Sequence, residues 1–501
     1  MEPGRSAMQR RPRGWLLGLA ALLLVGGCAT RPVNPPIAQA DPASGYRYST
    51  RAPYRADHEN LLILAFSGGG TRAAAFSYGV LEALRDIEIV GPRGNRERLL
   101  DAVDIVTGVS GGSFTALAYA LYGDRLFADY PERFLKRDVE GELLRRLLSP
   151  GNWPSLNSTG WGRSELAAQF YDEILFGGAT FGDLDRGKGP LAVVTATDIS
   201  TGARLAFVQP PFDILCSDVG KVKLSRAAAA SSAVPVVLSP VTMNNYGGTC
   251  GFALPKSLEL LTDRENPPRP AARAMQHLVA LQSYQDSVRR PYIHLVDGGI
   301  SDNLGMRGVL EVLEEIEALH ALGQPTPLDH VRRIVVVVVN SLSTPSTGWD
   351  RSEAAPGPLD VLLKATGVPI DHHSFEAVEL LKDMQHRWAT MRRVAASPAY
   401  TPGKDPGTDR AIRVPRADIH VIDVSFPRLA DQAEVEFLNS LPTSFALPAD
   451  AVDRLRAAAG EILRTSPDFQ RLLKEAGARP DSTWRHDLGV VARRIVSSYL
   501  D

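Results

Sequence analysis

Cysteine is scarce in this chain of 501 residues, which contains only three. That number excludes a disulfide-scaffolded miniprotein and a zinc module built on several cysteines. An excess of basic charge is also missing, because 55 Lys and Arg stand against 57 Asp and Glu, a formal net charge of -2. Nucleic-acid-binding proteins usually carry a strongly basic face, so no nucleic-acid partner is expected.

Two nucleotide and metal motifs are absent as well. No Gly-Lys pair is followed by Ser or Thr, as a P-loop requires, and His58-Glu59 lacks the second histidine of a His-Glu-x-x-His zinc site. The sequence therefore predicts no metal and no cofactor. What it does contain is 44% hydrophobic and 22% charged residues, a composition typical of a large globular protein with a full core.

The N-terminus differs in composition from the rest. Four arginines within residues 5–13 precede an apolar run of 11 residues, Trp15 to Val25, which is too short to span a bilayer but suits a signal peptide. The run ends in Val25-Gly26-Gly27-Cys28, which resembles a bacterial lipobox. We expect residues 1–27 to be a lipoprotein signal peptide, Cys28 to carry lipid, and residues 28–57 to form a tether. The alternative is an ordinary secretory signal.

From Leu61 onward, apolar runs alternate with helical patterns. Strands are predicted at 61–66, 103–107, 191–195, 292–296, 334–339 and 419–424. Helices are predicted after the first two strands and at 164–175, 306–321, 374–391 and 449–463. This alternation predicts an α/β fold with a mostly parallel central sheet flanked by helices.

The first candidate motif is Gly108-Val109-Ser110-Gly111-Gly112, a Gly-x-Ser-x-Gly sequence directly after a strand and before a helix. A sharp strand-to-helix turn exposes a serine nucleophile and leaves no room for large neighbours. The partial positive charge at the helix N-terminus would face the developing oxyanion. The alternative is a serine that only caps the helix.

The second motif is Ser67-Gly68-Gly69-Gly70-Thr71-Arg72. Consecutive glycines before a helix leave backbone N–H groups uncovered, which suits an oxyanion hole or another anion site. The same residues also fit a dinucleotide fingerprint, but the second buried strand ending in an acidic residue that this fingerprint needs is missing.

The third motif, Asp297-Gly298-Gly299, follows a predicted strand and places a carboxylate at its end. A Ser–acid–His triad would need a histidine after Asp297. The pair His372-His373 is the candidate for such a histidine, whereas we interpret His294 as a packed core histidine.

These three motifs, in this order, resemble the patatin-like phospholipase family. The resemblance implies an α/β domain over residues 58–345 with a Ser–Asp dyad and no catalytic histidine. Ser110 would be the nucleophile and Asp297 the base. The oxyanion hole would involve Gly68, Gly69, Gly70, Arg72 and Gly111, with Arg72 either orienting the loop or forming a helix-end salt bridge. The segments 196–202 and 227–235 also match the family. Residues 346–501 carry no recognised motif and are predicted to pack on or continue the catalytic domain.

The resemblance thus predicts a serine lipid acyl hydrolase that acts on lipids or esters. The lipobox-like sequence adds the expectation of a membrane anchor at Cys28. Alternatives are a transacylase that uses the same acyl-enzyme and a non-catalytic envelope scaffold. Ala29 stands where many inner-membrane lipoproteins have Asp, so by analogy the outer membrane is favoured over the inner. Cys216 and Cys250 could form a disulfide or remain two buried thiols.

Overall fold

A computed structural model describes residues 30–51, 59–90, 96–156, 158, 161–187, 189–261, 272–326, 328–342, 348–476 and 479–480. The predicted signal peptide and Cys28 lie outside these residues. Within the described part, no helix combines the length and apolar character needed to cross a membrane.

The centre of the fold is an eight-stranded sheet in the order β10-β9-β1-β4-β5-β8-β7, with β6 paired to β5. The strands are β1 (Asn60–Phe66), β4 (Val103–Gly108), β5 (Leu191–Asp198), β6 (Arg204–Ala206), β7 (Val241–Asn244), β8 (Tyr292–Val296), β9 (Arg333–Asn340) and β10 (Asp418–Ser425). The five strands from β10 to β5 are parallel, whereas β8 pairs antiparallel with both β5 and β7. The predicted mostly parallel sheet flanked by helices is confirmed.

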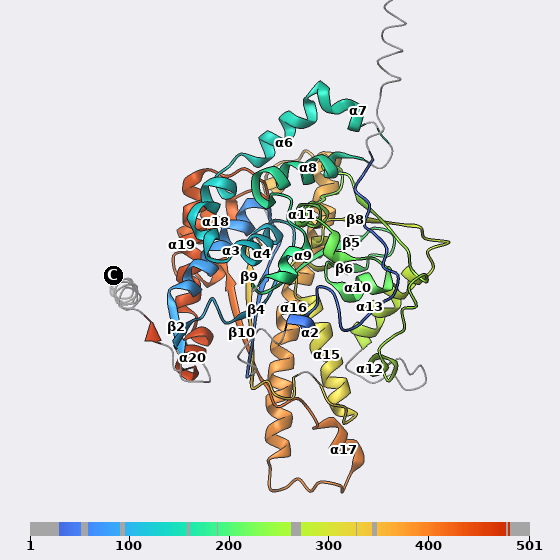
Figure 1. The fold of residues 1–501 in the computed structure, drawn as a ribbon. Helices are drawn as coiled ribbons and strands as arrows, with labels where there is room; N and C mark the ends of the chain where they lie inside the picture. Colours follow the sequence, from blue (N-terminus) through green and yellow to red (C-terminus); the bar gives the residue numbers. More distant parts are fainter. Residues whose placement is uncertain are drawn as a thin grey trace, which may run out of the picture.

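The two faces of the sheet are covered by different helices, as β1 illustrates. Leu62, Leu64 and Phe66 belong to one core cluster, together with α3 (Gly70–Arg85), α4 (Gly111–Tyr122) and α19 (Ala449–Thr465). Leu61, Ile63 and Ala65 belong to a second cluster with α15 (Arg307–Ala321) and α16 (Pro358–Ala395). This division follows from the alternation of side chains along a strand, and Figure 1 shows the helices on either side.

The C-terminal third shares this sheet. Strand β10 pairs with β9 along its whole length, and α19 packs against α3. Two shorter helices, α18 (Gln432–Ser440) and α20 (Pro467–Glu475), complete this side. The domain limits 58–345 and 346–501 remain predictions, although strand pairing crosses them.

Some elements depart from the sequence prediction. The helix predicted at 374–391 begins 16 residues earlier, at Pro358 in α16. Helix α8 (Arg163–Tyr171) continues into a π-helical turn, Asp172–Phe176. Several helices were not predicted, among them α6 (Val139–Leu148) and α13 (Ala272–Gln282). A small second sheet joins β2 (Ile87–Val90), β3 (Arg96–Arg98) and β11 (Arg479–Pro480).

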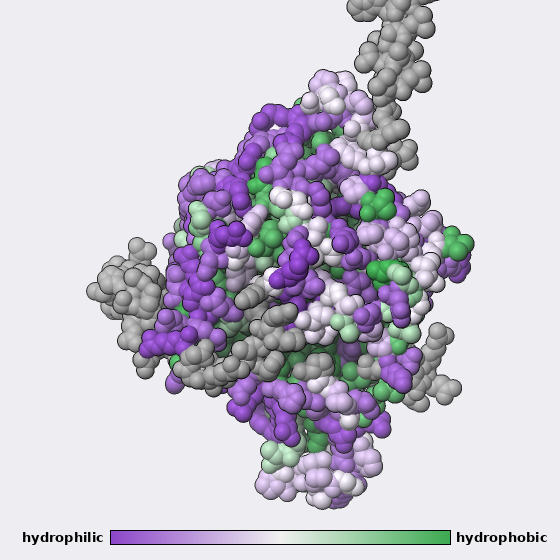
Figure 2. Space-filling view, viewed as in Figure 1, coloured by the Kyte–Doolittle hydropathy of each residue, from purple (hydrophilic) through white to green (hydrophobic). Residues whose placement is uncertain are grey.

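A disulfide and a mostly hydrophilic face are further features of the fold. Cys216 and Cys250 form a disulfide, which decides between the two states that the sequence left open. The face drawn in Figure 2 is mostly hydrophilic, with small, separate hydrophobic patches.

Candidate active site

Ser110 occupies a strained turn between β4 and α4. Its dihedrals are φ 47° and ψ -120°, a region that a residue with a side chain rarely adopts. The following residue must be glycine, because a Cβ on Gly111 would overlap the carbonyl of Gly70. This geometry is the one a serine nucleophile needs in a strand-to-helix elbow.

The hydroxyl of Ser110 donates a hydrogen bond of 3.1 Å from its Oγ to Oδ2 of Asp297. Both side chains are buried, with residue exposures of 7% and 8%. The other carboxylate oxygen, Oδ1, accepts the N–H of Gly299 at 2.7 Å. The structure therefore brings the predicted nucleophile and base together and fixes the orientation of the carboxylate.

Burial also changes the acidity of Asp297. Desolvation raises the pKa of its carboxyl to about 6, while the hydrogen bonds from Gly299 and Ser110 act in the opposite direction. A carboxylate with this pKa is mostly ionised at neutral pH and is a stronger base than a solvated aspartate. That property suits a group that must accept a hydroxyl proton.

Asp297 follows a strand that runs antiparallel to its neighbour β5 in the sheet. Strand β8 runs antiparallel to β5, with Val296 opposite Thr197, so its end does not lie among parallel strand ends. The end of β8 instead approaches the end of β4. Gly108, the last residue of β4, pairs with Val194, and β8 runs back along β5 from Asp198 toward that residue. The carboxylate and the serine thus meet from opposite directions.

One segment holds both turns in place. The Ser110 N–H donates to Oγ of Ser231 at 2.9 Å. The carbonyls of Ser231 and Ala233 accept the N–H groups of Gly298 and Asp297, each at 3.0 Å. Ser231 ends α11 (Leu224–Ser231) and lies in the segment 227–235. The resemblance to the family includes this segment but indicates no role for it. In the structure, its hydrogen bonds connect the turn at Ser110 to the turn at Asp297.

The glycine loop lies against the serine turn. Gly70 has φ 61° and begins α3, while Gly111 begins α4. The first N–H groups of a helix have no intrahelical acceptor, so Gly70 and Gly111 offer donors near Ser110. Gly69, with φ 136°, caps α3. The N–H of Gly68 is already used, because it donates to the carbonyl of Asn303 at 2.9 Å.

The residues of this site lie within the part of the chain that matches a known family. The family model described as "Patatin-like phospholipase" matches residues 64–310, which include the glycine loop, Ser110 and Asp297. Residues 64–310 belong to the patatin-like phospholipase family. No curated protein matches the chain.

The structural comparison found human GIVD cytosolic phospholipase A2 at 15% identity and a TM-score of 0.41, covering 90% of this chain and 68% of that one. The same protein in complex with a methyl gamma-linolenyl fluorophosphonate inhibitor and terbium chloride gave 13% identity and a TM-score of 0.38. That match covers 90% of this chain and 66% of that one. At these scores the likeness adds nothing to the family assignment.

Arg72 of the patatin-like domain reaches away from the serine. Its guanidinium donates to the carbonyl of Leu441 at 2.6 Å and to Oγ1 of Thr443 at 3.2 Å. The same C-terminal segment accepts the N–H of Thr71 through the carbonyl of Ser444 at 2.9 Å, and a Cβ on Gly70 would overlap that carbonyl. Arg72 therefore contacts the C-terminal segment behind the glycine loop, and these contacts suit a residue that orients the loop.

Asn303 is a site residue that the motifs did not identify. Its side-chain amide lies directly against Gly68, and its Nδ2 is buried with no hydrogen-bond partner among the described residues. A buried donor without a partner is costly unless something else occupies it. Asn303 lies between the glycine loop and the Asp297 turn, with its Oδ1 near both Gly68 and Gly299.

The histidines lie elsewhere in the patatin-like structure. His294 is exposed and its Nδ1 faces Oγ1 of Thr242 at 3.0 Å, so its interpretation as a core histidine is wrong. It lies next to the buried Leu295, and the alternation of β8 turns it outward. His372 and His373 are exposed on α16, and His373 faces Glu376. Among the residues that the structure describes, no cluster of His, Cys, Asp and Glu could hold a metal ion.

Proposed function

We propose that this protein is a serine lipid acyl hydrolase in which Ser110 and Asp297 act as a dyad. Membership of the patatin-like phospholipase family supports lipid acyl hydrolase activity. The observation that carries the finer assignment is the 3.1 Å hydrogen bond from Ser110 Oγ, in its strained turn, to the buried Asp297 carboxylate.

The proposed reaction has two halves. Ser110 Oγ attacks the ester carbonyl carbon while its proton passes to Asp297. The resulting oxyanion accepts hydrogen bonds from the N–H groups of Gly69, Gly70 and Gly111. The C–O bond to the alcohol then breaks, Asp297 returns the proton to the leaving alcohol, and an acyl-serine remains.

The second half repeats these steps with water. Asp297 accepts a proton from the water that attacks the acyl-serine, the oxyanion forms again, and the bond to Ser110 Oγ breaks as the serine regains a proton. A carboxylic acid leaves. If an acceptor alcohol replaces water, the same acyl-enzyme gives transacylation, which remains the alternative activity.

A fluorophosphonate probe tests the nucleophile directly. We expect covalent labelling of the full chain at Ser110 and its loss in Ser110→Ala. Labelling should be strongly slowed in Asp297→Asn, because the serine then lacks its base. A folded wild-type protein that takes no label would favour the alternative of a non-catalytic envelope scaffold.

We further propose that the protein is a lipoprotein of the bacterial cell envelope, anchored through Cys28 and directed to the outer membrane rather than the inner. The Val25-Gly26-Gly27-Cys28 sequence supports this placement. The Cys216–Cys250 disulfide fits it, because disulfides persist mainly in oxidising compartments outside the cytosol.

A further inference from the structure

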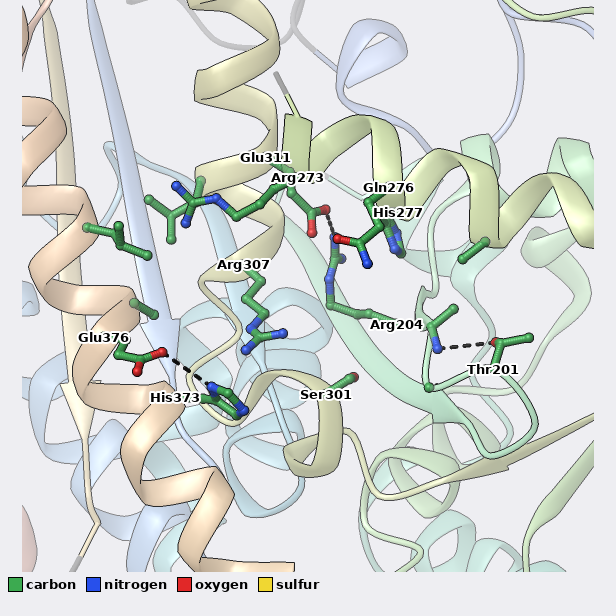
Figure 3. A pocket seen from close by; sticks show the side chains of 16 residues that line it. Thr201, Arg204, Arg273, Gln276, His277, Ser301, Arg307, Glu311, His373 and Glu376 are labelled. Carbon is green, nitrogen blue, oxygen red and sulfur yellow. Dashed lines mark hydrogen bonds and ion pairs between the residues drawn. The ribbon is translucent and has the colours of Figure 1, made fainter. Parts of the chain in front are cut away.

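A cavity of about 390 Å³ lies beside the short helix α14 (Gly299–Asp302), which directly follows the Asp297 turn. Three guanidinium groups line it, those of Arg204, Arg273 and Arg307, together with two carboxylates, Glu311 and Glu376. Figure 3 shows Arg307 from α15 pointing into the space between His373 and Ser301. We refer to this space as the head-group cavity.

The three arginines of this cavity differ in whether a carboxylate pairs with them. Arg204 pairs with Glu311, and Arg273 pairs with Glu314 at 2.6 Å. Arg307 forms no ion pair or side-chain hydrogen bond with the residues drawn in Figure 3. Arg204 is 9% exposed, and its Nε lies 4.0 Å from Oδ2 of Asp302 but has no hydrogen-bond partner in the described structure. The cavity therefore offers guanidinium donors, which suit a phosphate or carboxylate.

A second, apolar cavity of about 440 Å³ adjoins the first. It lies between the sheet and the helices α13 and α15, and its lining includes Ile63, Ile105, Val193, Leu278 and Val309. We refer to it as the chain cavity. The two cavities share three lining residues, Arg204, His277 and Glu311. Burial lowers the pKa of His277 to about 3, so this shared histidine is neutral and adds no charge at the boundary.

The chain cavity is distinct from the catalytic site. Neither Ser110, Asp297 nor the glycine loop 68–70 lines this cavity, and none of them lines the head-group cavity. The volume of the chain cavity is that of an ordinary small-ligand site. An apolar space joined to a cationic one matches a molecule with an alkyl chain and an anionic head.

We propose that the two cavities together bind one single-chain anionic amphiphile, such as a fatty acid or a lysophospholipid, at a site separate from Ser110. The head group contacts Arg307 and Arg204, and the chain lies between the sheet and α13. The choice of a lipid as ligand rests on the proposed function, whose products have this chemistry, but the cavities do not depend on the dyad.

The head-group cavity is connected to the catalytic turn by hydroxyl groups. Thr197 Oγ1 lies 2.9 Å from the carbonyl oxygen of Asp297, to which it donates, and 2.9 Å from Oγ of Ser301. Ser301 lines the cavity. A head group that forms a hydrogen bond with Ser301 would disturb its bond to Thr197, which in turn holds the backbone of Asp297. Occupancy of the site is therefore expected to change turnover at Ser110.

The test is a binding measurement on the full chain carrying Ser110→Ala, which removes turnover. The probes are dodecyl phosphate below its critical micelle concentration, inorganic phosphate, and dodecanol. Arg307→Gln should weaken dodecyl phosphate binding by about tenfold or more, since it removes a charge-assisted hydrogen bond, and Arg307→Lys should recover part of the loss. Arg289→Gln is the matched control, because Arg289 is an exposed arginine that lines neither cavity.

The chain cavity is tested with Ala274→Phe, which adds a ring to its lining. We expect this change to weaken dodecyl phosphate without affecting inorganic phosphate, and dodecanol to bind at least about tenfold more weakly than dodecyl phosphate. If Arg307→Gln and Arg289→Gln behave alike while melting temperatures are unchanged, the inference is overturned. Binding of inorganic phosphate as tight as that of dodecyl phosphate, and insensitive to Ala274→Phe, would assign a free-phosphate site and also overturn it.

Failure of the proposed function can be distinguished from failure of the amphiphile site. A wild-type protein that takes no fluorophosphonate label but binds dodecyl phosphate through Arg307 would retain the amphiphile site and lose the dyad. Normal labelling without Arg307-dependent binding would give the opposite result.

Discussion

The carbonyl oxygen of Leu441 accepts a 2.6 Å hydrogen bond from the guanidinium of Arg72, which is 2% exposed. The two residues are 369 positions apart. Because Thr71 and Gly70 also contact Ser444, the C-terminal third of the chain closes one side of the glycine loop. The geometry of the proposed oxyanion hole therefore depends on a segment beyond the residues that match the family model.

Replacing Arg72 with Met should impair both stability and turnover. The change leaves the Leu441 carbonyl without its charged donor, so the free energy of unfolding should fall by roughly 2–3 kcal/mol, and kcat should fall as the loop loses its support. Arg456→Met is the matched control, because Arg456 pairs with Glu82 and joins α19 to α3 away from the loop. Urea unfolding and steady-state kinetics check both. A destabilised Arg72→Met protein with unchanged kcat would show that Arg72 supports the fold alone.

Ser110→Ala and Asp297→Asn should each lower kcat by about 10³-fold or more on any ester that the wild type hydrolyses. The double variant should lose little beyond either single one, because the two side chains act as one unit. Ser352→Ala, a change at an exposed serine, should leave kcat unchanged. Near-normal activity of Ser110→Ala would contradict the dyad, and losses that add in the double variant would mean that the two residues act independently.

Much of this site could be anticipated from local sequence, and the reason is physical. The glycine loop follows the unbroken apolar run 61–66, and Ser110 follows a strand, β4, that is apolar apart from Asp104 and Thr107. Glycines are required where α3 and α4 approach each other. The route of Asp297 could not be anticipated, because strand direction depends on pairing between β8 and β5 and not on the composition of β8. The contact between Arg72 and Leu441 and the place of Asn303 also depend on distant segments, and no local pattern encodes them.

Asn303→Ala should separate activity from stability. If its buried Nδ2 donates to bound substrate, removing it should lower kcat/KM by roughly tenfold to a hundredfold, the effect of one lost hydrogen bond in a closed site. The melting temperature should stay constant or rise, because the free protein no longer buries a donor without a partner. A fall in melting temperature with unchanged kcat/KM would assign Asn303 a structural role.

Cys28→Ser should release the protein from the membrane fraction. The serine cannot accept the lipid, so the mature protein should lack the mass of the acyl groups and appear in soluble fractions of the cells. Mass spectrometry and fractionation measure the two effects. Cys28 lies outside the described residues, so a Cys216→Ser and Cys250→Ser double variant is a useful control that changes cysteine content without changing anchoring. Unaltered mass and fractionation of Cys28→Ser would refute lipidation at this residue.

The raised pKa of Asp297 makes opposite predictions for activity and stability. As a base, the carboxylate must be ionised, so kcat/KM should fall as pH decreases through about 6. The unfolded chain titrates this group near 3.9, and the folded state therefore binds its proton more tightly. The contribution of Asp297 to stability is then greatest below about pH 4 and is lost as pH rises through about 6. Asp297→Asn, which cannot ionise, should melt at a higher temperature than wild type at pH 8, with a smaller difference at pH 4.

A histidine base would give a similar acidic limb, because a free imidazole titrates near 6.5, so substitution must separate the two assignments. The dyad assigns no chemical role to any histidine, since the partner of the Ser110 hydroxyl is Asp297. Replacing His294, His372 or His373 singly with Gln should leave kcat within roughly tenfold, because loss of a true general base costs roughly 10²–10⁴-fold. Each variant is compared with Ser110→Ala on the same ester, with circular dichroism confirming the fold. A folded histidine variant that is as inactive as Ser110→Ala would replace the dyad with a triad.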